Sequence, residues 1–463
     1  MNHLNNDNRN LEEILEKVKN QGIDYLNNIH ERPTSNQNDN EINGVLNEAG
    51  LGTSEALAQF NTRFEPLIVA SSGPRYWGFV TGGTTPAAIA GDWLASIYDQ
   101  NTQSSKGNGD VSALIELETI QLLLSLFNLP KDFFGGFVTG ATLSNFTCLA
   151  IARQWIGKQS GKDFAREGIS GNVNILSATP HSSAIKSLSM LGLGSKNFIQ
   201  VNVLQGNREA LDIEDLTAKI KALNGEPFIL ISSAGTVNTV DFDDFEAINK
   251  LKEKHNFWWH IDAAFGGFAA CSSKYNHLVK GWENADSITV DCHKWLNVPY
   301  ESAVFFVKEK HVTLEVETFQ NANAAYLGNP MENFSYLNFL PENSRRLKAL
   351  PAWFTLKSYG KSGYEEIVNS NVEMALLFAD FINSSETFEL LAPVRLNTVC
   401  FSLKDETLAT GFLNSLNSTG KVFMTPTFYN GKKGIRAAFV NWRTSAADIA
   451  IVTTEMERIL TEI

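Results

Sequence analysis

Short runs of consecutive apolar residues alternate with helical stretches through the middle of the chain. The apolar runs cover residues 133–139, 173–178, 198–203, 227–232, 257–262, 287–290 and 303–307. Apolar positions at helical spacing separate several of them, as at residues 143–154, 213–222 and 245–254. Apolar strands that alternate with helices indicate a mainly parallel sheet with both faces covered. We therefore predict an α/β fold built on a large, mainly parallel seven-stranded sheet.

The two ends of the chain follow other patterns. Helices are predicted at residues 11–28, 54–64, 86–98 and 111–127, and the polar tract at 31–43 indicates a linker. After residue 344, helical stretches at 344–359 and 364–383 precede strands at 394–403, 421–425 and 434–441 and helices at 406–416 and 445–461. We predict three parts: an N-terminal helical segment (1–85), a large α/β domain (86–344) and a small C-terminal α+β domain (345–463).

Composition narrows the class of protein. The chain has 463 residues, of which 43% are hydrophobic and 19% charged, as is typical of a globular protein. Its net charge of −13 argues against a nucleic-acid or anionic-membrane partner. The four cysteines lack the spacing of a zinc site or a disulfide framework. Because the N-terminus lacks the apolar core of a signal peptide and no apolar run has the length of a membrane span, we expect a soluble cytoplasmic protein.

Two ionisable residues come at the ends of apolar runs in the proposed sheet. Asp262 ends the run Trp258-Trp-His-Ile-Asp262, and Lys294 follows the run 287–290. Ligands of such sheets bind at the carboxyl ends of the strands. A buried lysine amine can hold pyridoxal phosphate as a Schiff base, and a carboxylate can pair with the protonated pyridine nitrogen. The alternative is an ordinary buried ion pair with a stacked histidine.

Further small or polar residues follow neighbouring strands. The turn Gly140–Thr142 leads from a strand into a helix, where free backbone N–H groups favour a phosphate. His181 follows another strand, and the small residues of Ser232–Thr236 suit close packing against a ring. The segment 71–83, rich in glycine and aromatic residues, either lies close to a flat ligand or is a packed loop.

Together these motifs resemble those of the group II pyridoxal-phosphate-dependent amino-acid decarboxylases. The resemblance extends from about residue 65 to the C-terminus, and it is carried by Ile115-Glu-Leu-Glu-Thr119, Thr139-Gly-Ala-Thr142, Ser233-Ala-Gly-Thr236, His260-Ile-Asp-Ala-Ala264 and Asp291-Cys-His-Lys-Trp-Leu296. It implies the fold type I of pyridoxal-phosphate-dependent transferases and a homodimer with active sites at the subunit interface. It also implies pyridoxal 5′-phosphate as cofactor and decarboxylation of an L-amino acid to an amine and CO₂ through Schiff-base and quinonoid intermediates. An aldehyde-forming or carbon–carbon lyase reaction on the same fold is the alternative.

The resemblance also assigns roles to individual residues. Lys294 looks like the Schiff-base lysine, Asp262 like the partner of the ring nitrogen, and His181 like the histidine that stacks on the ring and orients the substrate. The other cofactor-binding positions implied by the match are Ala141 and Thr142 of the phosphate turn, Thr236, Ala264 and His293. Tyr336 resembles the loop tyrosine that protonates the substrate carbon, and Tyr326 is its rival because both lie in the corresponding region, 320–340.

Three positions depart from the family pattern or leave a role open. Val237 stands where aromatic-amino-acid decarboxylases have a threonine near the cofactor. Asp291 stands where those enzymes often have an asparagine close to the phosphate, so either phosphate binding differs or Asp291 points away. Arg436 resembles an arginine of the terminal domain, with a structural ion pair as the alternative reading. The substrate amino acid is not defined by these residues, although the aromatic residues near Trp77 slightly favour an aromatic or apolar one.

Overall fold

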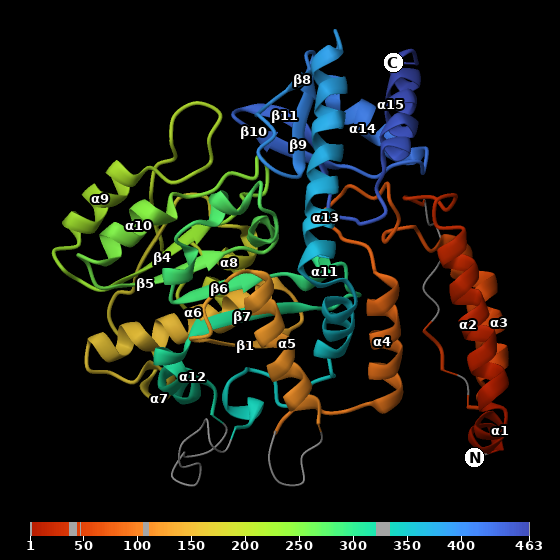
Figure 1. The fold of residues 1–463 in the computed structure, drawn as a ribbon, viewed down its shortest axis with the longest axis horizontal. Helices are drawn as coiled ribbons and strands as arrows, with labels where there is room; N and C mark the ends of the chain where they lie inside the picture. The colour runs from red at the N-terminus through yellow and green to blue at the C-terminus, as the bar shows by residue number, and fades with distance from the viewer. Residues whose placement is uncertain (1, 37–43, 47, 105–110, 321–333, 463) are drawn as a thin grey trace.

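The central element of the molecule is a seven-stranded sheet, seen in a computed structural model that describes residues 2–36, 44–46, 48–104, 111–320 and 334–462. The strands lie in the order β1-β7-β6-β5-β4-β2-β3 (Figure 1). Their bounds are β1 (Phe133–Val138), β2 (Asn174–Ser177), β3 (Ile199–Gln200), β4 (Phe228–Ser233), β5 (Phe257–Asp262), β6 (Ser287–Val290) and β7 (Ala303–Lys308). β7 is antiparallel to β1 and β6, and the other pairs are parallel. The predicted mainly parallel sheet is therefore confirmed, with a strand in each of the seven apolar runs.

Both faces of this sheet are buried. Along β4, Leu230 belongs to one apolar core, whereas Ile229 and Ile231 belong to a second core on the opposite face. Successive side chains of a strand point to opposite faces, so a strand covered on both sides needs apolar residues at every position. The covering helices are α5 (Ser112–Leu126), α6 (Ala141–Gln159), α7 (Phe164–Glu167), α8 (Ser182–Met190), α9 (Ile213–Ala222), α10 (Phe245–Lys252) and α12 (Val312–Phe319). This explains why the strands appear as unbroken apolar runs in the sequence.

A long helix, α13 (Ala349–Ser384), leads from the large sheet to a second, smaller sheet (Figure 1). The two helical stretches predicted here form one element that is kinked at Gly360, where φ is 58°. The small sheet has the order β10-β11-β9-β8 and is antiparallel throughout. Its elements are β8 (Phe388–Leu390), β9 (Thr398–Leu403), α14 (Ala409–Ser418), β10 (Thr425–Tyr429), β11 (Lys432–Ala438) and α15 (Ala446–Leu460).

Two strands of the small sheet were not predicted correctly. β8 is only three residues long, and the strand expected at 421–425 shares one residue with β10, Thr425. β10 lies at the edge of its sheet and contains Pro426, with Phe428 exposed, so it lacks the apolar pattern of a buried strand.

The N-terminal region consists of helices at one side of the molecule, away from the large sheet (Figure 1). They are α1 (Asn2–Arg9), α2 (Leu11–Asn27), α3 (Thr53–Arg63) and, closer to the core, α4 (Pro86–Tyr98). α1 was not predicted, because its sequence is polar throughout apart from Leu4. Several apolar side chains of α2 are exposed, including Leu11, Leu15 and Ile23. Among the helices of the described residues, none combines the length and apolar character that crossing a membrane requires.

Candidate active site

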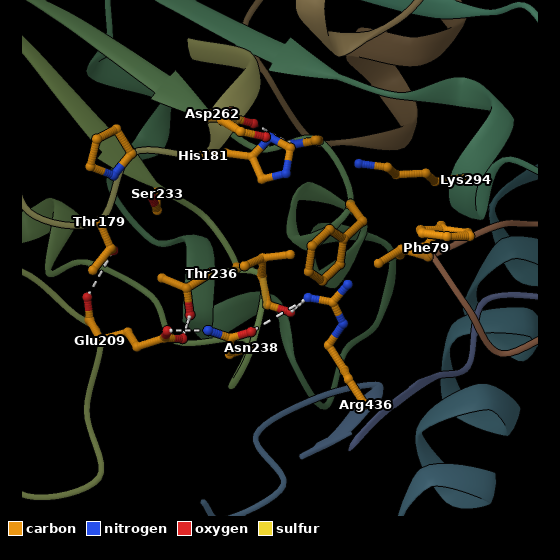
Figure 2. A pocket seen from close by; sticks show the side chains of 17 residues that line it. Phe79, Thr179, His181, Glu209, Ser233, Thr236, Asn238, Asp262, Lys294 and Arg436 are labelled. Carbon is orange, nitrogen blue, oxygen red and sulfur yellow. Dashed lines mark hydrogen bonds between the residues drawn. The ribbon is translucent and has the colours of Figure 1, made fainter. Parts of the chain in front are cut away.

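The carboxyl ends of the parallel strands open into a cavity of about 660 Å³. Asp262 ends β5 and lies in register with Ser233, the last residue of β4, while His181 follows β2 through a short turn. Figure 2 shows these three side chains around the cavity together with Lys294 and, on the opposite wall, Arg436. Residues that are far apart in the sequence meet here because parallel strands end at one edge of the sheet.

Asp262 is held in place by polar side chains within the sheet. Asp262 is 8% exposed, and its Oδ2 accepts a hydrogen bond from the Asn145 side-chain amide at 3.0 Å. The Asn145 Oδ1 in turn lies 2.8 Å from Nε2 of His260, whose Nδ1 is 2.9 Å from the Ser287 hydroxyl. Since the Asn145 amide donates to Asp262, its oxygen must accept, so Nε2 of His260 carries the proton. Burial lowers the pKa of His260 to about 4, which keeps this imidazole neutral.

Lys294 lies in the short helix α11 (Cys292–Trp295), directly after β6. Its Nζ is 3.0 Å from Oδ2 of Asp291. The glycine-rich segment 71–83 packs behind it: an added Cβ at Gly82 would lie 1.8 Å from the Lys294 carbonyl oxygen. Two residues of the same segment, Phe79 and Val80, line the cavity. The segment is therefore a packed loop that also contributes two apolar side chains to the cavity wall, and its approach to a flat ligand stays a prediction.

His181 caps the N-terminus of α8 and lies beside Asp262 in Figure 2. Its Nδ1 accepts a hydrogen bond from the backbone N–H of Ser183 at 3.2 Å, so the proton of the neutral ring is on Nε2. Burial is the main cause that lowers the pKa of His181 below its ordinary value of 6.5. A neutral ring beside the carboxylate can pack flat against a bound ring, and the stacking of His181 on the cofactor stays a prediction.

The predicted phosphate turn lies against a carboxylate. The backbone N–H of Ala141, the first residue of α6, donates to Oδ1 of Asp291 at 2.6 Å. The side chain of His293 is 3.7 Å from the other oxygen of Asp291. The open question about Asp291 is thus answered: it points toward the turn, and Ala141, His293 and Lys294 converge on it. Thr142 follows Ala141 in the first turn of α6.

The opposite wall of the cavity is polar. Glu209 accepts hydrogen bonds from the Thr236 hydroxyl at 2.5 Å and from the Asn238 amide at 3.1 Å. Arg436 of β11 donates a hydrogen bond to the Val237 carbonyl oxygen at 2.9 Å. Within the described residues, Arg436 forms no ion pair. The structural ion pair considered for Arg436 is therefore absent from this part of the chain, and the guanidinium fixes the backbone of the cavity wall instead.

Three residues that matter for this geometry were not predicted as site residues. Asn145 lies three residues after the phosphate turn on α6, so helical spacing places it on the same face and could have identified it. His260 belongs to the motif of residues 260–264, in which only Asp262 and Ala264 were predicted to contact the cofactor. Glu209 lies in a loop between β3 and α9, and the sequence around it gives no signal for its contacts with Thr236 and Asn238.

Tyr336 does not reach the cavity. It lies in a short 3-10 helix, is 0% exposed, and packs against Phe134 and Phe334 in an apolar core. Its hydroxyl lies 3.4 Å from the Gly135 carbonyl oxygen, and the Arg345 guanidinium lies over its ring at 4.4 Å. This geometry does not support the role of proton donor predicted for Tyr336, because its ring packs among aromatic residues in the core and its hydroxyl group does not face the cavity. Its rival, Tyr326, lies outside the described residues.

The chemistry of the donor set fits pyridoxal phosphate. A primary amine, Lys294, and a buried carboxylate, Asp262, line one cavity. Ala264 offers a small side chain beside them. The N-terminus of the 19-residue helix α6 lies next to Asp291, the residue that pairs with Lys294. Amine, acid, flat packing surface and anion site are the four features that this cofactor requires.

Comparisons with known proteins agree with this assignment. The model of the pyridoxal-dependent decarboxylase conserved domain matches residues 46–404. Phenylacetaldehyde synthase of Petunia hybrida is 27% identical over 399 residues, covering 81% of this chain and 78% of its own. Aromatic-L-amino-acid decarboxylase of Bacillus atrophaeus is 25% identical over 462 residues, covering 95% and 93%. The crystal structure of TDC from Oryza sativa with PLP and tryptamine superimposes with a TM-score of 0.88, at 21% identity and 98% coverage of both chains.

Proposed function

The chain belongs to the pyridoxal-dependent decarboxylase family, and on this premise we propose that it removes the α-carboxyl group of an aromatic L-amino acid. Pyridoxal-phosphate-dependent decarboxylation of an amino acid follows from the family, and fold type I follows from the structural similarity. The observation that carries the proposal is the meeting of Lys294, Asp262 and His181 around one cavity. The expected products are the corresponding amine and CO₂.

We assign the roles at the site as follows. Lys294 holds the cofactor covalently, and Asp262, oriented by Asn145, holds a proton on the ring nitrogen. When bound, pyridoxal phosphate supplies a protonated ring that accepts the electron pair left by the departing carboxyl group. His181 packs against that ring and orients the substrate. Ala141, Thr142 and His293 surround the phosphate end, while Thr236 and Ala264 line the walls beside the ring.

Two kinds of observation support an aromatic substrate. The cavity has an apolar side formed by Phe79, Val80, Val237 and Phe265. Apolar and aromatic side chains stabilise a flat apolar ring by removing its surface from water. The named relatives, Bacillus aromatic-L-amino-acid decarboxylase and Petunia phenylacetaldehyde synthase, are also named for aromatic compounds. Val237 stands where the resemblance gives aromatic-amino-acid decarboxylases a threonine, so this wall is more apolar here and is no argument for an aromatic substrate by itself.

An aldehyde-forming reaction is the second candidate. The similarity to phenylacetaldehyde synthase favours it, and so does the burial of Tyr336, which removes one candidate proton donor from the site. The two reactions differ in their products, since aldehyde formation consumes O₂ and water and releases ammonia and hydrogen peroxide together with the aldehyde and CO₂. Product analysis therefore separates them.

We further propose a homodimer with the active site at the subunit interface. Phe79, which lines the cavity, is 61% exposed, and Trp93, Ile97 and Tyr98 of α4 are between 45% and 62% exposed. Large apolar side chains that one helix leaves exposed favour burial by a second chain. Light scattering is expected to give twice the mass of one chain, and Ile97→Asp is expected to yield inactive monomers. A fully active protein with the mass of one chain would contradict the dimer.

We propose the cytoplasm as the compartment, because the four cysteines are unpaired and three of them are buried. Free thiols are typical of a reducing compartment. Measuring the redox state of these thiols in the native cell tests this point.

One experiment tests the reaction and the substrate together. The purified protein, loaded with pyridoxal phosphate, is incubated with each common L-amino acid while CO₂, amine, aldehyde and ammonia are measured. We expect CO₂ and amine in equal amounts from one or more of phenylalanine, tyrosine and tryptophan. Release of CO₂ from acidic or basic amino acids alone contradicts the aromatic substrate, and aldehyde with ammonia supports the second candidate.

A further inference from the structure

Asp291 is placed unusually for a carboxylate near a phosphate site. It follows β6 directly and is 3% exposed. One of its oxygens accepts the Ala141 N–H at 2.6 Å, and the other lies 3.0 Å from the Lys294 amine and 3.7 Å from His293. The carboxylate is thus bound by the backbone of the phosphate turn, by the candidate cofactor lysine and by the histidine beside it.

The partner of Asp291 is one of the groups that a phosphate would use. Ala141 is the first residue of α6, and the backbone N–H groups of a first helical turn, together with the helix dipole, favour an anion. A backbone N–H that donates to a carboxylate at 2.6 Å cannot make the same bond to a phosphate oxygen. Two anions held against one helix terminus also repel each other, most strongly where burial limits screening by water.

We propose that Asp291 competes with the phosphate group of the cofactor for the N-terminus of α6. Asp291 thereby sets how strongly the site prefers pyridoxal phosphate over pyridoxal, which lacks the phosphate. The carboxylate weakens the binding of the phosphate end while it pairs with the ammonium form of Lys294. The proposal rests on pyridoxal phosphate as the cofactor but not on which amino acid is decarboxylated, because it concerns cofactor binding alone.

The ratio of two binding constants tests the proposal. Protein freed of cofactor is titrated with pyridoxal phosphate and, separately, with pyridoxal, and binding is followed by absorbance and protein fluorescence. Asp291→Asn keeps the size of the side chain and an oxygen for the Ala141 N–H, but it removes the charge. We expect this variant to raise the preference for pyridoxal phosphate over pyridoxal by about tenfold or more, since a repulsion between neighbouring charges is lost. Any effect of the variant on Lys294 reactivity acts on both ligands and cancels in the ratio.

Glu209→Gln is the matched control. It also removes one buried negative charge, but from the opposite wall of the cavity, where Glu209 contacts Thr236 and Asn238. We expect the ratio to stay within about twofold of the original protein, because the effect of a charge falls with distance and screening. If Glu209→Gln raised the preference for pyridoxal phosphate as much as Asp291→Asn does, the net charge of the site, and not the contact at Ala141, would set the preference.

Inorganic phosphate gives a second readout that is independent of imine formation. It is expected to inhibit pyridoxal phosphate binding at lower concentration in Asp291→Asn than in the original protein. Should Asp291→Asn fail to fold, Asp291→Ser serves the same comparison, because serine is uncharged and still accepts a hydrogen bond. An unchanged or smaller preference for pyridoxal phosphate in a folded variant overturns the proposal, whereas failure of the proposed decarboxylation leaves these binding constants untouched.

Discussion

The Asn145 side-chain amide donates a hydrogen bond to Asp262 at 3.0 Å. Asn145 lies on α6, three residues after Thr142, which ends the turn expected to face the phosphate. Helix α6 thus serves both ends of the cofactor site: its first residue meets Asp291, and its fifth meets Asp262. His260, a neighbour of Asp262 on β5, fixes the other side of the Asn145 amide. Because Asn145 is 0% exposed, its orientation is set by these partners and not by water.

Asn145→Asp is expected to weaken cofactor binding sharply. The substitution keeps the size of the side chain but places a second carboxylate about 3 Å from Asp262, where two buried like charges repel each other. We expect the affinity for pyridoxal phosphate to fall by on the order of tenfold or more, measured by absorbance titration. Asn145→Ala should have a smaller effect, since it removes the hydrogen bonds to Asp262, Ser183 and His260 without placing a charge beside Asp262.

Asn174→Ala provides the control for this prediction. Asn174 begins β2, at the end of the sheet away from the cavity, and its amide donates to Glu226. The variant is expected to lose some stability without a change in cofactor affinity. Equal losses of affinity in Asn174→Ala and Asn145→Asp would show that the effect comes from damage to the fold.

Lys294 is expected to carry the cofactor covalently. Reduction with borohydride followed by peptide mapping should place the pyridoxyl group on the peptide that contains Lys294, and Lys294→Ala should retain no covalent label. The reason is that Lys294 is the one lysine lining the cavity within the described residues, where its amine faces Asp262 and His181 (Figure 2). Label recovered on a different lysine contradicts the assignment of the whole site.

The pH dependence of stability should report the buried His260. Burial lowers its pKa from 6.5 to about 4, so the unfolded chain binds a proton at a higher pH than the folded protein does. Stability is therefore lost as the pH falls from 6.5 toward 4. Between pH 7 and pH 4.5 this group is expected to cost about 2–3 kcal/mol. His260→Gln cannot titrate, so the free energies of unfolding of the two proteins should converge by about that amount, measured in urea.

Asp243 titrates in the same range with the opposite sign. Burial raises its pKa to about 6, so its contribution is lost as the pH rises from 3.8 through 6. Because Asp243 is present in both proteins, its contribution cancels when His260→Gln is compared with the original chain. A difference in unfolding free energy that stays constant from pH 7 to pH 4.5 would show that His260 is already protonated in the folded state.

Features carried by a continuous stretch of sequence were predicted well. All seven strands of the large sheet were found, because a strand buried on both faces leaves an unbroken apolar run. Asp262 and Lys294 were found for a related reason, since charged residues are rare at the ends of such runs. The fold then brings them to one cavity without further information, because parallel strands end at one edge.

Features that depend on contacts between distant segments were not predicted. The direction of Asp291 is decided by Ala141, which lies 150 residues away in the sequence. Glu209 is bound by Thr236 and Asn238 through a loop that has no pattern of its own. Tyr336 was predicted by counting back from Arg345 and Arg346, yet it packs with Phe334 in the apolar core. Spacing alone cannot tell a tyrosine of a site from one that completes an apolar cluster.

Removing the hydroxyl group of each candidate proton donor, Tyr336 or Tyr326, should have different effects. Tyr336→Phe is expected to keep amine formation within about twofold of the original protein, because its hydroxyl is buried beside Gly135 and reaches no substrate. Only a small loss of stability is expected, about 1 kcal/mol or less, since the hydrogen bond to the Gly135 carbonyl oxygen is long at 3.4 Å. If the donor is Tyr326, as the family resemblance allows, Tyr326→Phe should lower amine formation by roughly 10²–10⁴-fold, the usual range for a positioned acid.

The measurement is amine, aldehyde and CO₂ for both variants on one substrate, with the cofactor content of each protein as the control. A large loss in Tyr336→Phe at full cofactor content would mean that η7 (Tyr336–Asn338) leaves the core during the reaction and that Tyr336 is the donor after all.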